Sequence, residues 1–308
     1  MPVICPRSNI FKMPLNLPTD RTRIDAGPGT LYVVATPIGH RGDITLRAIR
    51  ILADVDMVAA EDTRHTGRLF AHYKISTRLI AYHEHNEARQ TPRLIDRLKA
   101  GNDIALVSDA GTPGISDPGY RLVTAALADS IPVIPIPGAS ALVTALSVSG
   151  LPTDSFIFIG FLPHKRARRT ELLKRLADED RTLIFYESPK RVLVFIKELE
   201  SVLGDRSAVL GREMTKLYEE FLRGTLSEIA DQLDERDTIK GECTLLVAGN
   251  KSKSPVSEEA VRAALVNALT IGDRPLSAIV KKVADQLGVS RNRAYKEALK
   301  IQSEIISQ

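Results

Sequence analysis

Residues 103–129, "DIALVSDAGTPGISDPGYRLVTAALAD", contain the pattern that decides the fold. A short apolar run at 103–107 is followed by a stretch rich in glycine, proline, serine and aspartate, and then by apolar residues at helical spacing. A buried strand that leads through a glycine-rich turn into a helix is the unit from which parallel α/β sheets are built. The stretch therefore predicts one strand–turn–helix unit of such a sheet.

The same unit recurs on both sides of this stretch. Apolar runs at 31–36, 54–60 and 131–137 each lead through a turn into a segment with helical spacing. Strands that alternate with helices predict a mostly parallel sheet covered on both faces. Ligands of open α/β sheets bind outside the carboxyl ends of the strands, so the turns after these runs are the expected ligand loops.

A second α/β unit follows the first. Strands are expected at 155–163, 181–187, 206–213, 218–226 and 241–249, and helices at 171–178 and 188–204, the second ended by Gly204. The alternation in 218–226 is typical of an antiparallel strand, so this sheet should be mixed. The fold class is α/β, with an N-terminal tail at 1–29, a first domain at 30–138, a second at 139–249, and a linker and helical domain at 250–308.

The last of these segments has the layout of a helix-turn-helix. Gly288 stands at the expected corner and Ser290 at the N-cap of the following helix. A small helical domain used for packing or dimerisation would give the same pattern. From residue 251 onward there are ten Lys/Arg against six Asp/Glu, whereas the first 250 residues are balanced. This asymmetry favours a polyanionic partner, and the alternative is a solvated charged surface.

Composition excludes several classes of protein. Apolar residues make up 44% and charged residues 26%, as in ordinary soluble globular chains. No apolar stretch approaches the roughly 20 residues of a membrane helix, and 1–29 lacks the apolar core of a signal peptide. The two cysteines, Cys5 and Cys243, fit neither a disulfide framework nor a zinc site, and we expect Cys243 to be a small buried apolar residue. We expect a cytoplasmic protein without a membrane partner.

The glycine-rich turns match neither of the commonest nucleotide motifs. "TPIG" at 36–39 is not the dinucleotide fingerprint G-x-G-x-x-G, and 110–119 lacks the Gly-Lys-Ser/Thr ending of a P-loop. Nicotinamide cofactors and nucleoside triphosphates are therefore disfavoured.

Seven motifs then appear in order: "TPIGHRGDIT" (36–45), "AAEDTRHTG" (59–67), "SDAGTPGISDPG" (108–119), "PIPGASA" (135–141), "GFLPHK" (160–165), "FYESPKR" (185–191) and "REMTKLYEE" (212–220). Together they resemble the tetrapyrrole methylase-like superfamily of S-adenosylmethionine-dependent enzymes. Within it the resemblance is closest to enzymes that methylate a cytidine ribose 2′-hydroxyl in small-subunit (16S) ribosomal RNA. It covers residue 30 to the end. His40 stands where many members have Asn, and we expect it to adjust a turn.

The resemblance implies a methyl donor, S-adenosylmethionine, held in a cleft between two α/β domains. It also implies small-subunit ribosomal RNA as the partner, in the assembled small subunit, and a homodimer. The donor-binding residues that it implies are Pro37, Gly39, Asp109, Gly111, Thr112, Pro113, Ile115, Ser116, Ser140, Ala141, Phe161, Leu162, Arg212 and Glu213.

The chemistry of ribose methylation adds catalytic candidates. A ribose hydroxyl is a poor nucleophile until its proton leaves, so a general base or a cation beside it is expected. The segment 61–66 offers Glu61, Asp62, Arg64 and His65. We assign proton handling to Asp62 or Glu84 and phosphate contact to Arg64. The structural alternatives are that Asp62 caps a helix and that Arg64 pairs with a neighbouring carboxylate.

Two further sets of residues complete the prediction. RNA-backbone contacts are assigned to Lys165, Arg166, Arg168 and Arg169, whose alternative is an exposed helix start, and to Arg291 and Arg293. Asp117 is expected to cap the helix that begins after it, and no metal site is expected. The competing functions are methylation of a tetrapyrrole or another small molecule, and a non-catalytic nucleic-acid-binding regulator.

Overall fold

The computed structural model describes residues 27–250, 258–271, 275–287 and 289–306, and it divides the chain into two compact units, Met1–Ser140 and Ala141–Gln308. Most of the predicted tail (1–26), the linker (251–257) and Gly288 lie outside the described residues. The finer domain boundaries predicted from the sequence stay a proposal.

The first unit contains one fully parallel five-stranded sheet in the order β3-β2-β4-β1-β5. Its strands are β1 (Leu31–Val34), β2 (Met57–Ala60), β3 (Leu79–Ala81), β4 (Ile104–Val107) and β5 (Val133–Ile136). Both β2 and β4 are buried at every position, as strands with helices on both faces must be. The predicted parallel sheet is confirmed.

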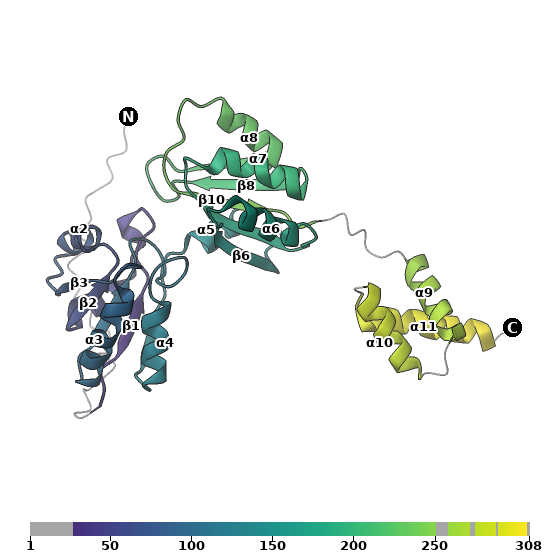
Figure 1. Ribbon diagram of the computed structural model, residues 1–308, viewed down its shortest axis with the longest axis horizontal. Coiled ribbons are helices and arrows are strands. Elements are labelled where there is room, and N and C mark those ends of the chain that lie inside the picture. The colour runs from purple at the N-terminus through teal and green to yellow at the C-terminus, as the bar shows by residue number, and fades with distance from the viewer. Residues whose placement is uncertain (1–26, 251–257, 272–274, 288, 307–308) are drawn as a thin grey trace, which may run out of the picture. The chain divides into compact units, whose positions relative to one another are not determined.

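Helices cover this sheet on both faces (Figure 1). α1 (Leu46–Asp54) and α2 (Thr63–Tyr73) share one apolar cluster with the sheet, while α3 (Glu87–Lys99) and α4 (Tyr120–Ala128) share another. The short strand β3 and the helix α3 were not singled out from the sequence, because β3 has only three residues and no strong apolar run.

The turn after β1 contains a short 3₁₀-helix at Arg41–Asp43, and His40 is its N-cap. The backbone N–H of Gly42 donates to His40 Nδ1 at 3.1 Å. The expected role of His40 in a turn is confirmed.

The second unit contains a mixed sheet in the order β6-β7-β10-β8-β9. Its strands are β6 (Phe156–Phe161), β7 (Thr182–Glu187), β8 (Ser207–Arg212), β9 (Glu220–Thr225) and β10 (Cys243–Val247). β9 pairs antiparallel with β8, as predicted from its alternating pattern. α6 (Arg166–Leu176), α7 (Val192–Leu203) and α8 (Leu226–Asp234) pack on one face of the sheet, and α5 (Ala141–Ser147) precedes β6. Gly204 ends α7 with φ +81°, as expected.

Three helices follow: α9 (Glu258–Ile271), α10 (Leu276–Leu287) and α11 (Arg291–Ile306), which share an apolar core of their own. The backbone N–H of Arg293 donates to Ser290 Oγ at 3.3 Å, so the predicted N-cap is confirmed. The helix-turn-helix interpretation stays a prediction.

The predicted burial of Cys243 is also confirmed. Cys243 is 4% exposed at the start of β10, and burial raises the pKa of its thiol to about 12. Among the described residues, no helix is long and apolar enough to cross a membrane.

Candidate active site

The loops after β1 and β4 meet at the carboxyl edge of the first sheet. β1 and β4 are neighbours, but their loops lead to helices on opposite faces, α1 and α4. The backbone groups of Thr36 and Gly111 bond to each other in both directions, at 2.9 and 3.0 Å. A point where neighbouring loops diverge to opposite faces is where open α/β sheets bind ligands.

Backbone geometry at this point requires glycine. Gly111 has φ +77°, a conformation that side chains with a Cβ rarely adopt. Gly138, after β5, passes so close to β1 that an added Cβ would lie 2.9 Å from the Cβ of Ala35. Thr112 Oγ1 donates to the carbonyl of Ala139 at 3.4 Å, which ties the loops after β4 and β5 together. The structure thus gathers the predicted donor residues Pro37, Gly39, Asp109, Gly111, Thr112, Pro113, Ile115, Ser116 and Ser140 onto three adjoining loops.

A second pair of contacts joins the loops after β2 and β4. The Glu61 carboxylate accepts a hydrogen bond from the backbone N–H of Asp109 at 3.2 Å. In return the Asp109 carboxylate accepts one from the backbone N–H of Asp62 at 3.0 Å. Burial raises the pKa of the Glu61 carboxyl, and the charge of Asp109 adds to this effect.

Asp62 and Arg64 form a bidentate ion pair with each other. Asp62 is the N-cap of α2, where its carboxylate accepts from the Arg64 backbone N–H at 2.8 Å. The Arg64 guanidinium also donates to both carboxylate oxygens, at 3.1 and 2.8 Å. Hydrogen bonds from Arg64 hold the pKa of Asp62 far below its usual range, so this carboxylate is a weak base. Both structural alternatives that the sequence left open are present.

A pocket of about 780 Å³ opens beside these loops. Glu61 and Glu84 line it, together with Tyr120 and Arg121 at the start of α4. The complete lining is Glu61, Glu84, Glu87, Ser116, Asp117, Pro118, Gly119, Tyr120, Arg121, Thr124, Ala125 and Ala128. Of the predicted catalytic residues, Glu84 lines the pocket and neither Asp62 nor Arg64 does.

The wall of this pocket also corrects one prediction. α4 has Gly119 as its N-cap residue, with φ +146°, and not Asp117 as expected. A Cβ at position 119 would lie 2.9 Å from a methyl of Leu106. Because that methyl can shift, the φ of +146°, which residues with a Cβ rarely adopt, is the stronger reason for glycine where the chain enters α4.

His83, at the end of β3, has an unusual hydrogen-bonding state. The Asn86 side chain accepts from the His83 backbone N–H at 2.9 Å and donates its two hydrogens to Ala81 O and to His83 Nε2. Since Nε2 then accepts, this network assigns the ring proton to Nδ1. Nδ1 is buried and has no hydrogen-bond partner among the described residues.

The second unit presents the remaining predicted donor residues at the ends of β6 and β8. Phe161 is 54% exposed and its ring meets the edge of Tyr186, whereas Leu162 is buried in the core. Arg212 pairs with Glu220 at 2.9 Å, and Glu213 accepts from Lys216 at 2.8 Å. Ala141 is the first residue of α5. The side chains of Leu162, Arg212 and Glu213 are thus already engaged within their own unit.

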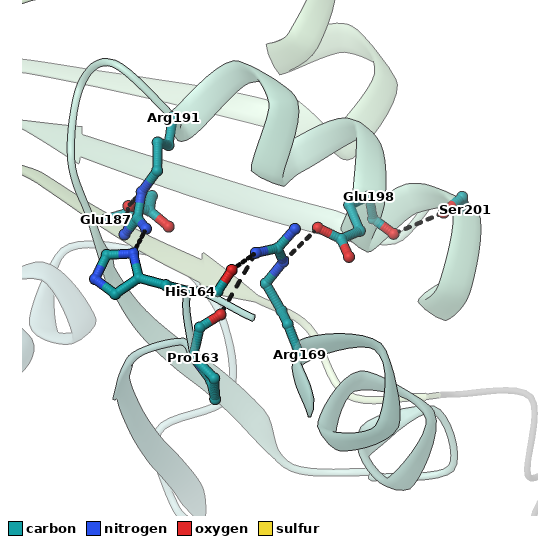
Figure 2. Close-up of polar contacts among 7 residues, drawn as sticks. All are labelled: Pro163, His164, Arg169, Glu187, Arg191, Glu198 and Ser201. Carbon is teal, nitrogen blue, oxygen red and sulfur yellow. Dashed lines mark hydrogen bonds and ion pairs between the residues drawn. The ribbon is translucent and has the colours of Figure 1, made fainter. Parts of the chain in front are cut away.

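The predicted RNA-contact segment divides into two kinds of residue. Lys165, Arg166 and Arg168 are exposed, in and beside the first turn of α6. Arg169, by contrast, is paired with Glu198 at 2.7 Å and also donates to the carbonyls of Pro163 and His164 (Figure 2), contacts that the sequence did not predict. Both partners of this ion pair are about four-fifths buried, so Arg169 anchors the loop before α6 to α7.

A second ion pair holds the same loop. Arg191 donates to the buried carboxylate of Glu187 and meets His164 Nδ1 at 2.6 Å (Figure 2). In the helical part of the chain, Arg291 lies 3.9 Å from Asp285, both exposed, and Arg293 lies in the first turn of α11. Among the described residues, no group of three or more His, Cys, Asp or Glu could hold a metal ion.

The model of the Tetrapyrrole (Corrin/Porphyrin) Methylases matches residues 30–230. The chain belongs to this family. A solved uroporphyrin-III C-methyl transferase from Thermus thermophilus, complexed with S-adenyl homocysteine, shares the fold with a TM-score of 0.51 and 20% identity, over 71% of this chain and 97% of its own.

Curated relatives match almost the whole chain. A protein of Halalkalibacterium halodurans is 50% identical over 87% of this chain and 93% of its own length. Another, from Micromonospora olivasterospora, is 47% identical over 89% of this chain and 87% of its own. Both are named Ribosomal RNA small subunit methyltransferase I. The two-sheet α/β fold of this family is confirmed here, and the chain is a methyltransferase.

Three residues of the pocket were missed as site residues from the sequence. Glu61 belongs to the candidate cluster at 61–66, in which the sequence favours Asp62, but Glu61 directly follows the buried strand β2 and so stands nearest the sheet edge. Tyr120 and Arg121 fall in a helix and carry no motif. The one feature of the sequence that could have identified them is their position directly after the glycine-rich loop.

Proposed function

We propose that this methyltransferase transfers the methyl group of S-adenosylmethionine to the 2′-hydroxyl of a cytidine ribose in small-subunit ribosomal RNA. The observation that carries the proposal is the 47–50% identity, over nearly the full length, to proteins named Ribosomal RNA small subunit methyltransferase I. The choice of cytidine and of the 2′-oxygen rests on the motif resemblance described above.

The loops after β1, β4 and β5 in the first unit could form a binding site for the donor. The positive φ of Gly111 and the close approach of Gly138 to Ala35 keep side chains away from the tied loops. Main-chain N–H and C=O groups there can hold a carboxylate or an adenine edge. The donor-binding assignment of Pro37, Gly39, Asp109, Gly111, Thr112, Pro113, Ile115, Ser116 and Ser140 on these loops, and of Ala141, Phe161, Leu162, Arg212 and Glu213 in the second unit, remains part of the proposal.

When bound, the donor supplies an electrophilic methyl group on a sulfonium sulfur. The protein has to orient that group and the ribose in line, and positioning of this kind provides a large share of the acceleration. It must also remove the hydroxyl proton, for which the pocket offers carboxylates.

The start of α6 supports a polyanionic substrate. The first turn contains no acidic residue, Lys165 provides no side-chain cap, and Arg166 and Arg168 are exposed. Cations at a helix N-terminus oppose the helix dipole, whereas a phosphate bound there would be favoured by both the dipole and the cations. We assign RNA-backbone contact to these three residues, and to Arg291 and Arg293 in the helical domain.

The decisive experiment is transfer of a radiolabelled methyl group to assembled small ribosomal subunits. We expect label in one cytidine, and no label when that ribose is replaced by its 2′-deoxy form. Uroporphyrin III is the control substrate, because a solved protein of this fold is named a uroporphyrin-III C-methyl transferase. Labelling of the porphyrin instead of the RNA would contradict the proposal. Sedimentation of the same preparation tests the proposed homodimer.

A further inference from the structure

The pocket of about 780 Å³ in the first unit shares one residue, Ser116, with the set assigned to the donor, and the rest of its lining lies outside that set and can serve another ligand. Its size lies within the roughly 300–1,000 Å³ usual for small-molecule sites. One wall is the segment Ser116–Gly119, which continues the loop assigned to the donor. Whatever binds in this pocket therefore lies beside the donor loop.

The lining of the pocket does not suit a phosphate. Glu61, Glu84 and Asp117 line it, and the one arginine, Arg121, pairs with Glu87 at 3.3 Å. An excess of carboxylates repels phosphates but accepts hydrogen bonds from hydroxyl and amino groups. Glu84 is exposed and makes no hydrogen bond or ion pair with any residue that the structure describes.

An aromatic ring completes the lining. Tyr120 is 78% exposed at the first position of α4. Proteins that recognise splayed-out nucleotides stack the base on such a ring, and carboxylates accept from the N4 amino group of cytosine. Ring and carboxylates together fit the sugar and base of a nucleotide, with the phosphates outside.

Glu61 stands where this pocket meets the donor loop. Its Oε2 is fixed by the backbone N–H of Asp109, and Oε1 has no hydrogen-bond donor among the described residues. The titratable groups that act on Glu61 are Asp109 from the loop after β4, His83 from the loop after β3, and Asp62 beside it. The unpartnered Nδ1–H of His83 is a buried donor, and such donors are rare in folded proteins unless a ligand or water satisfies them.

We propose that this pocket receives the ribose and base of the target nucleotide and that Glu61 accepts the proton of the 2′-hydroxyl. The inference rests on the proposed ribose methylation. The O–H bond breaks and its proton goes to Glu61 Oε1. The freed electron pair on oxygen forms the bond to the methyl carbon, and the electron pair of the carbon–sulfur bond stays on sulfur. Glu61 later returns the proton to water.

The test compares Glu61→Gln with the wild type and with Glu235→Gln, an exposed site at the end of α8. Gln can still accept from the Asp109 N–H but cannot take a proton. We expect single-turnover methyl transfer to small subunits to fall by about 10²–10⁴ in Glu61→Gln and to stay unchanged in Glu235→Gln. Calorimetry with S-adenosylhomocysteine and filter binding of small subunits should give wild-type affinities for both variants.

The pH profile separates a base from a structural residue. Since burial raises the pKa of Glu61, the wild-type rate should rise with pH through an acid limb and then level off, and the limb should vanish in Glu61→Gln. Tyr120→Ala should weaken small-subunit binding about tenfold, in keeping with the loss of one stacking contact, and Tyr120→Phe should restore it.

Three results would overturn the inference: an unchanged rate in Glu61→Gln, a loss of S-adenosylhomocysteine binding in that variant, or unchanged subunit binding in Tyr120→Ala. None of them touches the proposed function, which depends on the wild type alone. A wild type that fails to methylate the 2′-hydroxyl would refute both.

Discussion

Glu61 and Asp109 hold each other's loops in place. The Glu61 carboxylate accepts from the Asp109 N–H at 3.2 Å, and the Asp109 carboxylate accepts from the N–H next to Glu61 at 3.0 Å. Each carboxylate thus fixes the backbone from which the other projects. The loop assigned to the donor and the carboxylate assigned to the hydroxyl proton are joined by two hydrogen bonds.

The conformation of Gly111 gives the first prediction. Gly111→Val should abolish binding of S-adenosylhomocysteine, measured by calorimetry, because a side chain at φ +77° distorts the loop. Gly150→Val is the matched control, since Gly150 has φ +76° and open space around it. Both variants should lose a similar stability, about 1–2 kcal/mol for a side chain held in this region. A folded Gly111→Val protein with wild-type affinity would refute the donor assignment of this loop.

Asp62 provides a second prediction, which separates capping from catalysis. Asp62→Ala should lower the melting temperature by a few degrees, because α2 loses its N-cap, while Asp62→Asn should keep it, since Asn caps equally well. Both should retain methyl transfer to small subunits. Loss of activity in Asp62→Asn, with stability intact, would restore Asp62 as the base.

The start of α6 gives a third prediction. Reversing the charges of Arg166 and Arg168 to Glu should weaken RNA binding and leave S-adenosylhomocysteine binding intact. If both contact phosphates, the dependence of log K on log salt should become shallower by about 1.5. Equal affinity of the double variant and the wild type at all salt concentrations would exclude this surface.

Arg169 should behave differently from these two neighbours. Arg169→Ala leaves the mostly buried Glu198 without its ion-pair partner, so the second unit should lose about 3 kcal/mol of stability in urea unfolding. The salt dependence of RNA binding should not change. A stable Arg169→Ala protein with a shallower salt dependence would return Arg169 to the RNA surface.

Glu220 gives a prediction about pH. Hydrogen bonds from Arg236 and Arg212 lower the pKa of its carboxyl from 4.5 to about 2. Because the folded-state pKa is depressed, this stabilisation is present above about pH 4.5 and is lost as the pH falls towards 2. We expect it to be on the order of 2 kcal/mol after solvent screening. The stability difference between wild type and Glu220→Gln should shrink over this range, and a constant difference would contradict the assignment.

The sequence predicted the elements whose pattern is local. Local sequence is enough to recognise the buried runs of β2 and β4 and the glycine-rich turn at 108–119, without knowledge of what they contact. The same is true of the antiparallel strand β9. α8 was hidden, because it begins at Leu226 directly after β9 and the two read as one segment. β3 was missed for a different reason, because it has only three residues and no strong apolar run.

The candidate site was harder to predict, because its decisive contacts join distant residues. Glu61 and Asp109 are 48 positions apart, and Arg169 and Glu198 are 29 apart. Composition and motif identify such residues as charged and near a strand end. They do not say which of two adjacent carboxylates caps a helix and which faces a pocket. The roles of these two carboxylates depend on the exact residue at which β2 ends. Because Glu61 and Asp62 are adjacent, a shift of one residue in that end would exchange their positions.

The double link between Glu61 and the loop of Asp109 has a consequence for the order in which ligands bind. A donor that orders the loop beginning at Asp109 also fixes the carboxylate bonded to its N–H. The acceptor nucleotide then binds beside a Glu61 carboxylate that is already held in position. Because coupling between two ligands is reciprocal, binding of the nucleotide raises the affinity for the donor by the same factor. The two substrates should therefore bind with positive cooperativity, and breaking either hydrogen bond should make their affinities independent.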